Sequence, residues 1–268
     1  MACLMPLKRN NVTLRGAGSS TIVFAHGFGC SQEMWRYVAP AFEADHRVVL
    51  FDHVGAGHSD LSAYSVEKYG NLAGYAQDVL EIAAALDLRD ATFVGHSVSA
   101  MIGVLASGLS RETFSRLVLV GPSPRYLNDD GYVGGFDRNE IEELLDFLDS
   151  NPLGWSSHMA PVIVGNPDRP EHAEELKNSF CRTDPGIARH FARTTFTADN
   201  RADLAKVDVP TLVLQCRDDL IAPEVVGRYV QQNISNSRFV LLDVTGHCPN
   251  LTAPEELIRE IRKFIAAP

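Results

Sequence analysis

The sequence predicts an α/β protein with a mainly parallel, doubly wound sheet that is covered by helices and interrupted by a helical insertion. Short runs of β-branched and other apolar residues alternate along the chain with longer amphipathic segments. The runs are almost continuously apolar, as in strands that are buried on both faces of a sheet. A chain of 268 residues, 45% of them hydrophobic and 22% charged, can bury a full core of this kind.

Six segments are predicted to be strands because each is short and rich in Val, Leu, Ile and Phe. In chain order they are residues 21–26, 46–52, 91–96, 116–121, 210–216 and 238–243. The stretches between most of them are long enough for the helices that parallel neighbours need.

Helices are predicted where apolar residues recur at three- and four-residue spacing. Segment 75–88 has this spacing along one face, at Tyr75, Val79, Ile82, Ala83 and Leu86. Two later helices are expected to begin at Pro223 and Pro254, because proline suits the first turn of a helix.

The alternation stops between residues 121 and 201, where no segment has the character of a strand. Three helical segments are predicted there, at 138–150, 171–181 and 185–196. We therefore expect a core domain made of residues 1–121 and 202–268, with residues 122–201 inserted as a helical lid over the carboxyl edge of the sheet.

Composition excludes several classes of protein. The net charge of −10 and the absence of a Lys/Arg cluster argue against a nucleic-acid-binding protein. No stretch approaches the ~20 apolar residues of a membrane span, and the charges of the N-terminal stretch 1–11 follow its apolar run, the reverse of a secretory signal. A soluble cytoplasmic protein is expected. An odd number of cysteines without C-x-x-C spacing predicts neither disulfides nor a zinc site: Cys3, Cys30, Cys181, Cys216 and Cys248.

A serine lies at the junction of a predicted strand and a helix, in the stretch VGHSVSAM at residues 94–101. Ser97 at such a place is either a helix N-cap or the nucleophile of a strand–turn–helix elbow, which needs small residues two positions to either side. Gly95 meets that need. Ser99 departs from the usual glycine, although serine is the smallest polar substitute.

Two backbone N–H groups are candidates for an oxyanion hole that would support a nucleophilic Ser97. Val98 begins the predicted helix, so its N–H group points toward the serine. The second candidate is Phe28, in the stretch HGFGC at residues 26–30, which follows the first predicted strand and turns at Gly27.

A histidine and a carboxylate follow the last two predicted strands. His247 comes after segment 238–243 and directly after a turn glycine, and neutral imidazole can take the proton of a serine and return it. Asp218 and Asp219 follow segment 210–216, and the usual position four residues before a proline, here Pro223, favours Asp219 as the partner of the histidine. Serine, aspartate and histidine in this order are typical of the α/β-hydrolase fold, and their chemistry needs no metal or organic cofactor.

Aromatic and sulfur-containing side chains of the lid are expected to form a pocket above Ser97. Each taken alone is more typical of core packing, but together they indicate a small, mostly apolar ligand. With the neighbours of the serine, the oxyanion loop and the histidine, the predicted lining is Phe28, His96, Tyr126, Phe136, Trp155, Met159, Phe196 and Cys248.

Two other signals are weaker. The G-x-G in VGAGHSD (54–60) lacks the third glycine and the helix of a dinucleotide site, and His53 and His58 are expected to be surface or second-layer residues. The lid segment 137–149 holds six acids and one arginine, which indicates either a solvated helix face or a docking surface for a partner.

The chain resembles one known family over nearly its full length: the bacterial stress-response regulators typified by RsbQ and the plant strigolactone and karrikin receptors. The similarity is strongest to the RsbQ type, and it is carried by long collinear stretches, among them HGFGCSQEMW, GYAQDVLEIAAALDL, VGHSVSAM, GPSPRYLND, LQCRDDLIAP and GHCPN. Ser99 matches the plant receptors, whereas the RsbQ type has glycine there.

The resemblance implies a hydrolase core, a four-helix V-shaped lid over an enclosed hydrophobic pocket, and a triad of Ser97, Asp219 and His247. It also implies one of two roles. RsbQ-like proteins act with a phosphatase that carries a PAS sensor domain, in activating a general stress sigma factor. The plant relatives bind and slowly cleave butenolide hormones. The expected activity is hydrolysis of a small apolar ester or lactone, or ligand sensing through a protein partner.

Overall fold

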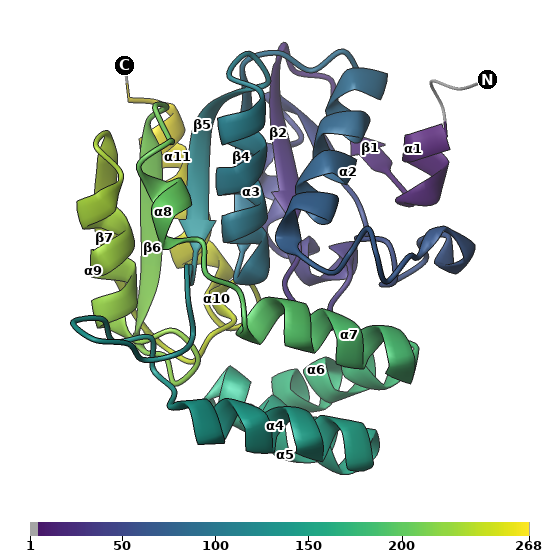
Figure 1. Ribbon diagram of the computed structural model, residues 1–268. Coiled ribbons are helices and arrows are strands. Elements are labelled where there is room, and N and C mark those ends of the chain that lie inside the picture. Colours follow the sequence, from purple (N-terminus) through teal and green to yellow (C-terminus); the bar gives the residue numbers. More distant parts are fainter. Residues whose placement is uncertain (1–4, 268) are drawn as a thin grey trace.

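A seven-stranded sheet runs through the molecule, and helices cover both of its faces in the computed structural model, which describes residues 5–267 (Figure 1). Residues 1–4, part of the N-terminal stretch in which no secretory signal was predicted, and residue 268 lie outside that description. The strand order is β1-β3-β2-β4-β5-β6-β7, and all neighbours are parallel except β1 and β3. The predicted fold class, a mainly parallel doubly wound sheet, is confirmed.

The strand order places a topological switch point between β2 and β4, because the chain fills one side of β2 first and then the other. Ligands bind at the carboxyl ends of strands beside such a point in open α/β sheets. The seven strands are β1 (Thr13–Arg15), β2 (Ser20–Ala25), β3 (His46–Leu50), β4 (Ala91–His96), β5 (Phe114–Val120), β6 (Thr211–Asp218) and β7 (Ser237–Thr245).

All six predicted strands form, and the sequence missed only β1. This strand has three residues, is half-buried to exposed and pairs antiparallel with β3 at the edge of the sheet. A strand so short and so polar carries no period that the sequence could reveal.

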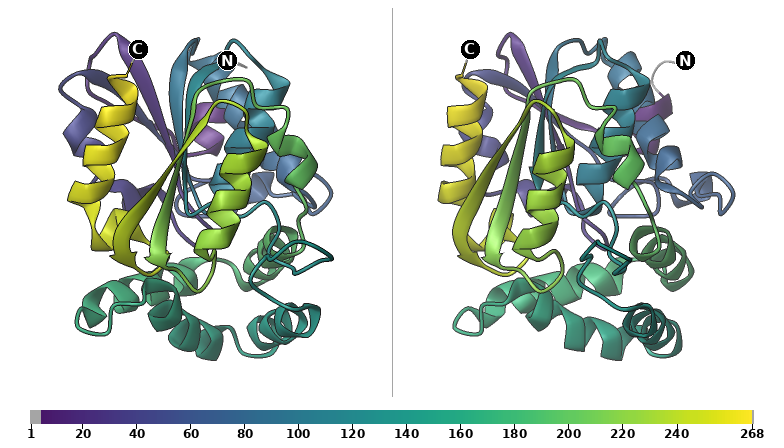
Figure 2. Two further views of the ribbon diagram at one scale, coloured as in Figure 1. Left: turned by 90° about the vertical axis from the view of Figure 1, so that its left-hand side faces the viewer. Right: turned by 60° about the vertical axis from the view of Figure 1, so that its left-hand side comes forward.

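Alternate residues of the central strands face two separate cores, one on each side of the sheet. In β2, Val23 and Ala25 pack into one core, and Ile22 and Phe24 pack into the other. The first core lies under α2 (Leu72–Ala85), α3 (Val98–Leu109), α8 (Arg201–Leu204) and α9 (Glu224–Asn233). The second lies under α11 (Pro254–Ile265) and the 3-10 turns η2 (Gln32–Trp35) and η3 (Ala39–Phe42). Figure 2 shows α11 on the side of the sheet opposite to α9.

Three predicted helix starts can be compared with the structure. α2 begins three residues before the predicted start at 75, because the Asn71 side chain accepts a hydrogen bond from the Ala73 N–H group and caps the helix there. Pro254 is the first residue of α11, as predicted, whereas Pro223 occupies the cap position just before α9. The remaining short elements are α1 (Met5–Arg9), η4 (Leu61–Ala63) and α10 (Pro249–Thr252).

Four helices between β5 and α8 lie across the carboxyl ends of the strands (Figures 1 and 2). We call them the lid helices: α4 (Arg138–Ser150), α5 (Pro152–Val164), α6 (Pro170–Arg182) and α7 (Pro185–Phe196). Periodicity along the chain indicated three of them and missed α5, which contains Gly154 and an internal proline, Pro161. Both residues lower helix propensity, so α5 depends on its packing against the other lid helices.

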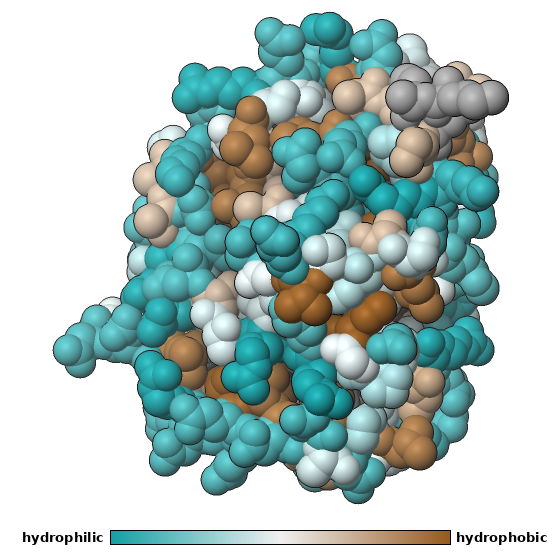
Figure 3. Space-filling view, turned by 45° about the vertical axis from the view of Figure 1, so that its right-hand side comes forward, coloured by the Kyte–Doolittle hydropathy of each residue, from teal (hydrophilic) through white to brown (hydrophobic). Residues whose placement is uncertain are grey.

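The surface is largely hydrophilic on the face drawn in Figure 3, where hydrophobic residues appear in separate patches. Across residues 5–267, no helix is long and apolar enough to cross a membrane.

Candidate active site

Ser97 stands on a strained turn between β4 and α3. Its φ of 57° and ψ of −123° lie in a region that side chains with a Cβ rarely adopt. A Cβ on Gly95 would run into the carbonyl oxygen of Ser99, so only glycine fits at that position. Ser97 occupies the N-cap position of α3, but its hydroxyl makes no capping hydrogen bond. The hydroxyl is therefore left for another partner.

That partner is His247, and behind it lies Asp219. The Ser97 hydroxyl donates to His247 Nε2 at 2.8 Å, and His247 Nδ1 donates to Asp219 Oδ2 at 2.7 Å. All three side chains are buried. Serine comes from the end of β4, aspartate from the loop after β6 and histidine from the loop after β7, so the sheet brings together residues that are 150 positions apart.

The carboxylate of Asp219 is fixed by its own loop. Its Oδ1 accepts hydrogen bonds from the backbone N–H groups of Ile221 and Ala222, at 2.8 and 3.0 Å. Gln215 Nε2 donates to Oδ2 at 3.2 Å. The neighbouring Asp218 is exposed and does not reach the histidine. Of the two aspartates that the sequence left as candidates, the structure brings Asp219 to His247.

The backbone of His247 is held from two sides. Its N–H group donates to the Ile163 carbonyl in the last turn of lid helix α5, at 2.7 Å, and its carbonyl accepts from His96 Nε2 at 2.8 Å. Burial lowers the pKa of His96 to about 3, so this ring is neutral and carries one proton, on Nε2. Gly246 is also required next to the histidine, because a Cβ there would run into the Val164 carbonyl.

Two backbone N–H groups beside Ser97 have no acceptor among residues 5–267: those of Phe28 and Val98. The loop that carries Phe28 lies close to the serine, since a Cβ on Gly27 would be 3.3 Å from Ser97 Cβ. His26 Nδ1 donates to the Gly27 carbonyl at 2.8 Å. Unpaired N–H groups at this place are what an oxyanion hole needs.

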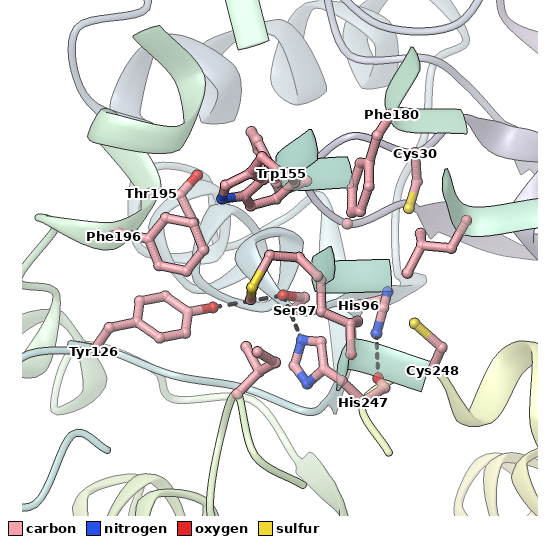
Figure 4. Close-up of a pocket in the computed structure, with 16 residues that line it drawn as sticks. Cys30, His96, Ser97, Tyr126, Trp155, Phe180, Thr195, Phe196, His247 and Cys248 are labelled. Carbon is pink, nitrogen blue, oxygen red and sulfur yellow. Dashed lines mark hydrogen bonds between the residues drawn. The ribbon is translucent and has the colours of Figure 1, made fainter. Parts of the chain in front are cut away.

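A cavity opens above Ser97 between the sheet and the lid helices (Figure 4). Most of the side chains around it are apolar. The Tyr126 hydroxyl lies 3.5 Å from Ser97 Oγ. Seven of the eight predicted pocket residues line the cavity: Phe28, His96, Tyr126, Trp155, Met159, Phe196 and Cys248.

The eighth predicted pocket residue, Phe136, needs correction because it does not line the cavity. Its backbone forms a bridge with Leu127, donates to the Tyr126 carbonyl at 3.1 Å and accepts from Asn128 N–H at 2.7 Å. This pairing fixes the chain at the entry to the lid, where the half-buried ring packs against the lid core.

Several lining residues were missed by the sequence analysis. Leu176 and Phe180 are one helical turn apart on the buried face of α6, a spacing that could have identified them once α6 was expected to face the pocket. The others carry no local signal, because the fold alone brings them to the cavity: Cys30, Ile163, Thr195 and Ile221.

The two cysteines of the cavity are not nucleophiles at neutral pH. Burial raises the pKa of Cys30 to about 12 and that of Cys248 well above its usual value, so both remain thiols. Over residues 5–267, no group of three or more His, Cys, Asp and Glu side chains could hold a metal ion.

Comparison with known proteins gives concordant results. A model of the alpha/beta hydrolase family matches residues 22–260. The Petunia hybrida protein named karrikin insensitive 2 receptor CA is 37% identical, over 96% of this chain and 95% of the relative. A strigolactone esterase of Arabidopsis thaliana is 38% identical over 97% of each chain. The structure of a hydrolase from Oleispira antarctica superposes with a TM-score of 0.97 at 40% identity, over 99% of this chain and 98% of that one. The two plant matches agree with the resemblance to strigolactone and karrikin proteins noted from the sequence.

Proposed function

Because the chain belongs to the alpha/beta hydrolase family, we propose that it is a serine hydrolase that cleaves a small, mostly apolar ester or lactone. One observation carries the proposal: a continuous hydrogen-bonded chain from Asp219 through His247 to Ser97 ends at a buried apolar cavity. The name of the Arabidopsis relative, an esterase of a lactone, agrees with this substrate class.

Each group has a defined task in the proposed reaction. His247 Nε2 takes the hydroxyl proton while Ser97 Oγ attacks the carbonyl carbon, and Asp219 stabilises the imidazolium that forms. The oxygen of the tetrahedral intermediate is held by the N–H groups of Phe28 and Val98. His247 then protonates the leaving oxygen, and the acyl group remains on Ser97.

Water completes the cycle. His247 takes a proton from a water molecule that attacks the acyl-enzyme, and the proton returns to Ser97 as the acid leaves. These steps use only side chains of the protein and water. With a lactone, the leaving alcohol stays attached to the acyl group until this second step releases the opened hydroxy acid.

Replacing Ser97 tests the proposal. We expect Ser97→Ala to lower kcat for p-nitrophenyl acetate by at least about 10³, because the nucleophile is lost while the cavity is kept. Ser107→Ala is the matched control: Ser107 is also a buried serine of α3, and within residues 5–267 its hydroxyl has no hydrogen-bond partner. Hydrolysis by the Ser97→Ala protein at the wild-type rate would refute the assignment.

A second role, ligand sensing through a protein partner, is favoured by the lid. On α4, Glu142 and Glu143 are exposed, and neither forms a hydrogen bond or an ion pair with another of the residues 5–267. Such a surface suits the partner that the RsbQ resemblance implies, a phosphatase with a PAS domain in stress signalling. A receptor of this kind would hydrolyse its ligand slowly and change in stability when the ligand binds.

Pull-down with a PAS-domain phosphatase tests this second role. We expect the double variant Glu142→Gln, Glu143→Gln to retain less phosphatase than wild type, while Glu67→Gln, an exposed change outside the lid, has no effect. Glu140 is left intact, because its side chain accepts from the Asp137 N–H group and completes the capping box of α4. Equal retention by all three proteins would count against docking on α4.

A further inference from the structure

We infer that the Ser99 hydroxyl is a positioning group that aligns the oxyanion loop (residues 26–30) with the nucleophile, an inference that rests on the proposed hydrolase function. Ser99 is the residue at which this chain departs from the glycine of the usual elbow pattern. Its side chain does more than fit the turn, because it makes hydrogen bonds from helix α3 to two loops.

Ser99 connects three segments that are distant in sequence. Its Oγ is buried at the start of α3 and donates to the His26 carbonyl, just after β2, at 2.5 Å. The same oxygen accepts from His53 Nε2, in the loop after β3, at 2.7 Å. His53, expected from the sequence to be a surface or second-layer residue, is itself buried, with 1% of its surface exposed.

The bond from Ser99 acts on the loop that presents the Phe28 N–H group. The peptide unit between Gly27 and Phe28 is planar, so the Gly27 carbonyl and the Phe28 N–H group move together. His26 Nδ1 holds that carbonyl at 2.8 Å, and Ser99 holds the carbonyl of His26 itself. The direction of the Phe28 N–H group therefore depends on where Ser99 keeps residue 26.

The proton on each ring is fixed by its neighbours. The backbone N–H group of His53 donates to His26 Nε2 at 3.1 Å, so the single proton of a neutral His26 is on Nδ1, where it serves the Gly27 carbonyl. Burial lowers the pKa of His26 and that of His53, so both rings are neutral. His53 then carries its proton on Nε2, toward Ser99, in agreement with an Nδ1 that has no partner among residues 5–267.

The elbow accommodates serine at position 99 because the backbone and the side chain of this residue face different neighbours. The backbone of Ser99 is the surface that excludes a Cβ at Gly95, so the tight contact of the turn involves main chain only. The side chain of Ser99 instead contacts the oxyanion loop, through its hydrogen bond to the His26 carbonyl. With glycine at 99, the buried carbonyl of His26 and the ring Nε2–H group of His53 would both lose this partner.

The test compares the effect of one substitution on the rate of ester hydrolysis with its effect on the binding of two ketone inhibitors. We expect Ser99→Ala to lower kcat for p-nitrophenyl acetate roughly tenfold, a part of the ~10²–10³ lost when an oxyanion donor is removed outright. Inhibition by a small alkyl trifluoromethyl ketone, whose adduct with Ser97 is tetrahedral and anionic, should weaken by the same factor. Inhibition by the matching methyl ketone, which stays trigonal, and KM should change less than about twofold. Ser107→Ala, in the same helix, should change none of these values.

A second pair of variants decides the matter if Ser99→Ala does not fold. His53→Gln keeps an N–H donor within reach of Ser99, whereas His53→Leu removes it, so the glutamine variant should restore the kcat that the leucine variant loses. The inference is overturned if folded Ser99→Ala has wild-type kcat and wild-type affinity for the fluorinated ketone, or if both ketones weaken equally. It is equally overturned if the two His53 variants have the same kcat. Failure of the proposed function differs from these results, because Ser97→Ala would then hydrolyse esters as fast as wild type.

Discussion

Two adjacent aspartates, Asp218 and Asp219, differ in their exposure to solvent and in their hydrogen-bond partners. Asp219 is buried and accepts hydrogen bonds from two backbone N–H groups and from the His247 ring. Asp218 is exposed, and its carboxylate accepts a hydrogen bond from the Thr245 hydroxyl at 3.4 Å. The pairing of β6 with β7 is irregular between residues 216 and 218, immediately before residue 219.

The two aspartates provide a matched pair of variants. Asp219→Asn should lower kcat about 10³–10⁴-fold, because an amide that donates to Nδ1 holds the histidine in the tautomer that cannot accept the serine proton. Asp218→Asn should leave kcat within about twofold of wild type. Steady-state hydrolysis of p-nitrophenyl acetate measures both, and similar losses in the two variants would refute the assignment of Asp219.

The turn around Ser97 gives a prediction about stability. Gly95→Ala should destabilise the fold by about 3 kcal/mol, because the added Cβ meets the backbone of Ser99 and the Ala100 nitrogen. Gly108→Ala, near the other end of α3, should stabilise by roughly 0.5–1 kcal/mol, since that position is exposed and the nearest atom to its Cβ would be 3.9 Å away. Urea unfolding measures both changes, and opposite signs are expected.

At the scale of elements, the sequence was most informative where one local pattern decides the structure. The six strands β2 to β7 are strongly apolar and form as predicted, and α11 begins at the predicted proline. Helix α2 also forms, although it begins three residues before its predicted start. Strand β1 and lid helix α5 were missed because a three-residue strand has no period and Pro161 hides a helix that tertiary packing supports.

In the candidate site, too, the residues fixed by local sequence were predicted and those fixed by tertiary contacts were not. Ser97, Asp219 and His247 follow strands directly, so their place at the carboxyl edge could be predicted from order alone. Phe136 was misplaced because its position depends on a bridge to Leu127 that no local pattern announces. The partnership of Ser99 and His53 was missed for a related reason, since it joins helix α3 to a loop residue 46 positions away in sequence.

Lid helix α6 carries the one exposed cysteine among those that the structure describes. Cys181 lies near the end of this helix, whereas Cys30, Cys216 and Cys248 are buried, and burial raises the pKa of each of these three thiols. We expect iodoacetamide at pH 7.5 to modify Cys181 in the native protein and to leave the other three intact.

Peptide mass mapping before and after unfolding in guanidinium checks this labelling pattern. The experiment uses the Cys3→Ser protein, so that only the cysteines at 30, 181, 216 and 248 can react. Labelling of Cys30 or Cys248 in the native state at the rate of Cys181 would contradict the burial of these two thiols.

At the scale of the whole molecule, buried histidines link stability to pH. Burial lowers the pKa of His26, His53 and His96 from the usual 6.5, for His96 to about 3. Below pH 6.5 the unfolded chain therefore binds protons that the folded protein does not bind. The free energy of unfolding should fall with falling pH, by up to about 1.4 kcal/mol per pH unit for each such histidine.

Denaturant titrations between pH 7.5 and 5 measure this dependence. Over that interval the unfolding free energy should be nearly constant above pH 7 and decline below pH 6.5. His96→Gln should decline less steeply, because it has one titrating group fewer. A free energy that stays constant down to pH 5 would show that these rings are accessible to protons in the folded state.

The hydrogen bond from the His247 N–H group to the Ile163 carbonyl joins the lid to the loop after β7. Asn166 strengthens the same junction, since its side chain donates to the Thr245 carbonyl at 2.9 Å. Shortening α5 to make room for larger substrates would thus also remove the hydrogen bond that holds the backbone of His247. A cavity that accepts larger substrates should therefore be made by replacing Trp155 or Met159 with smaller residues while the lid helices stay intact. Shortening α5 is not a suitable route.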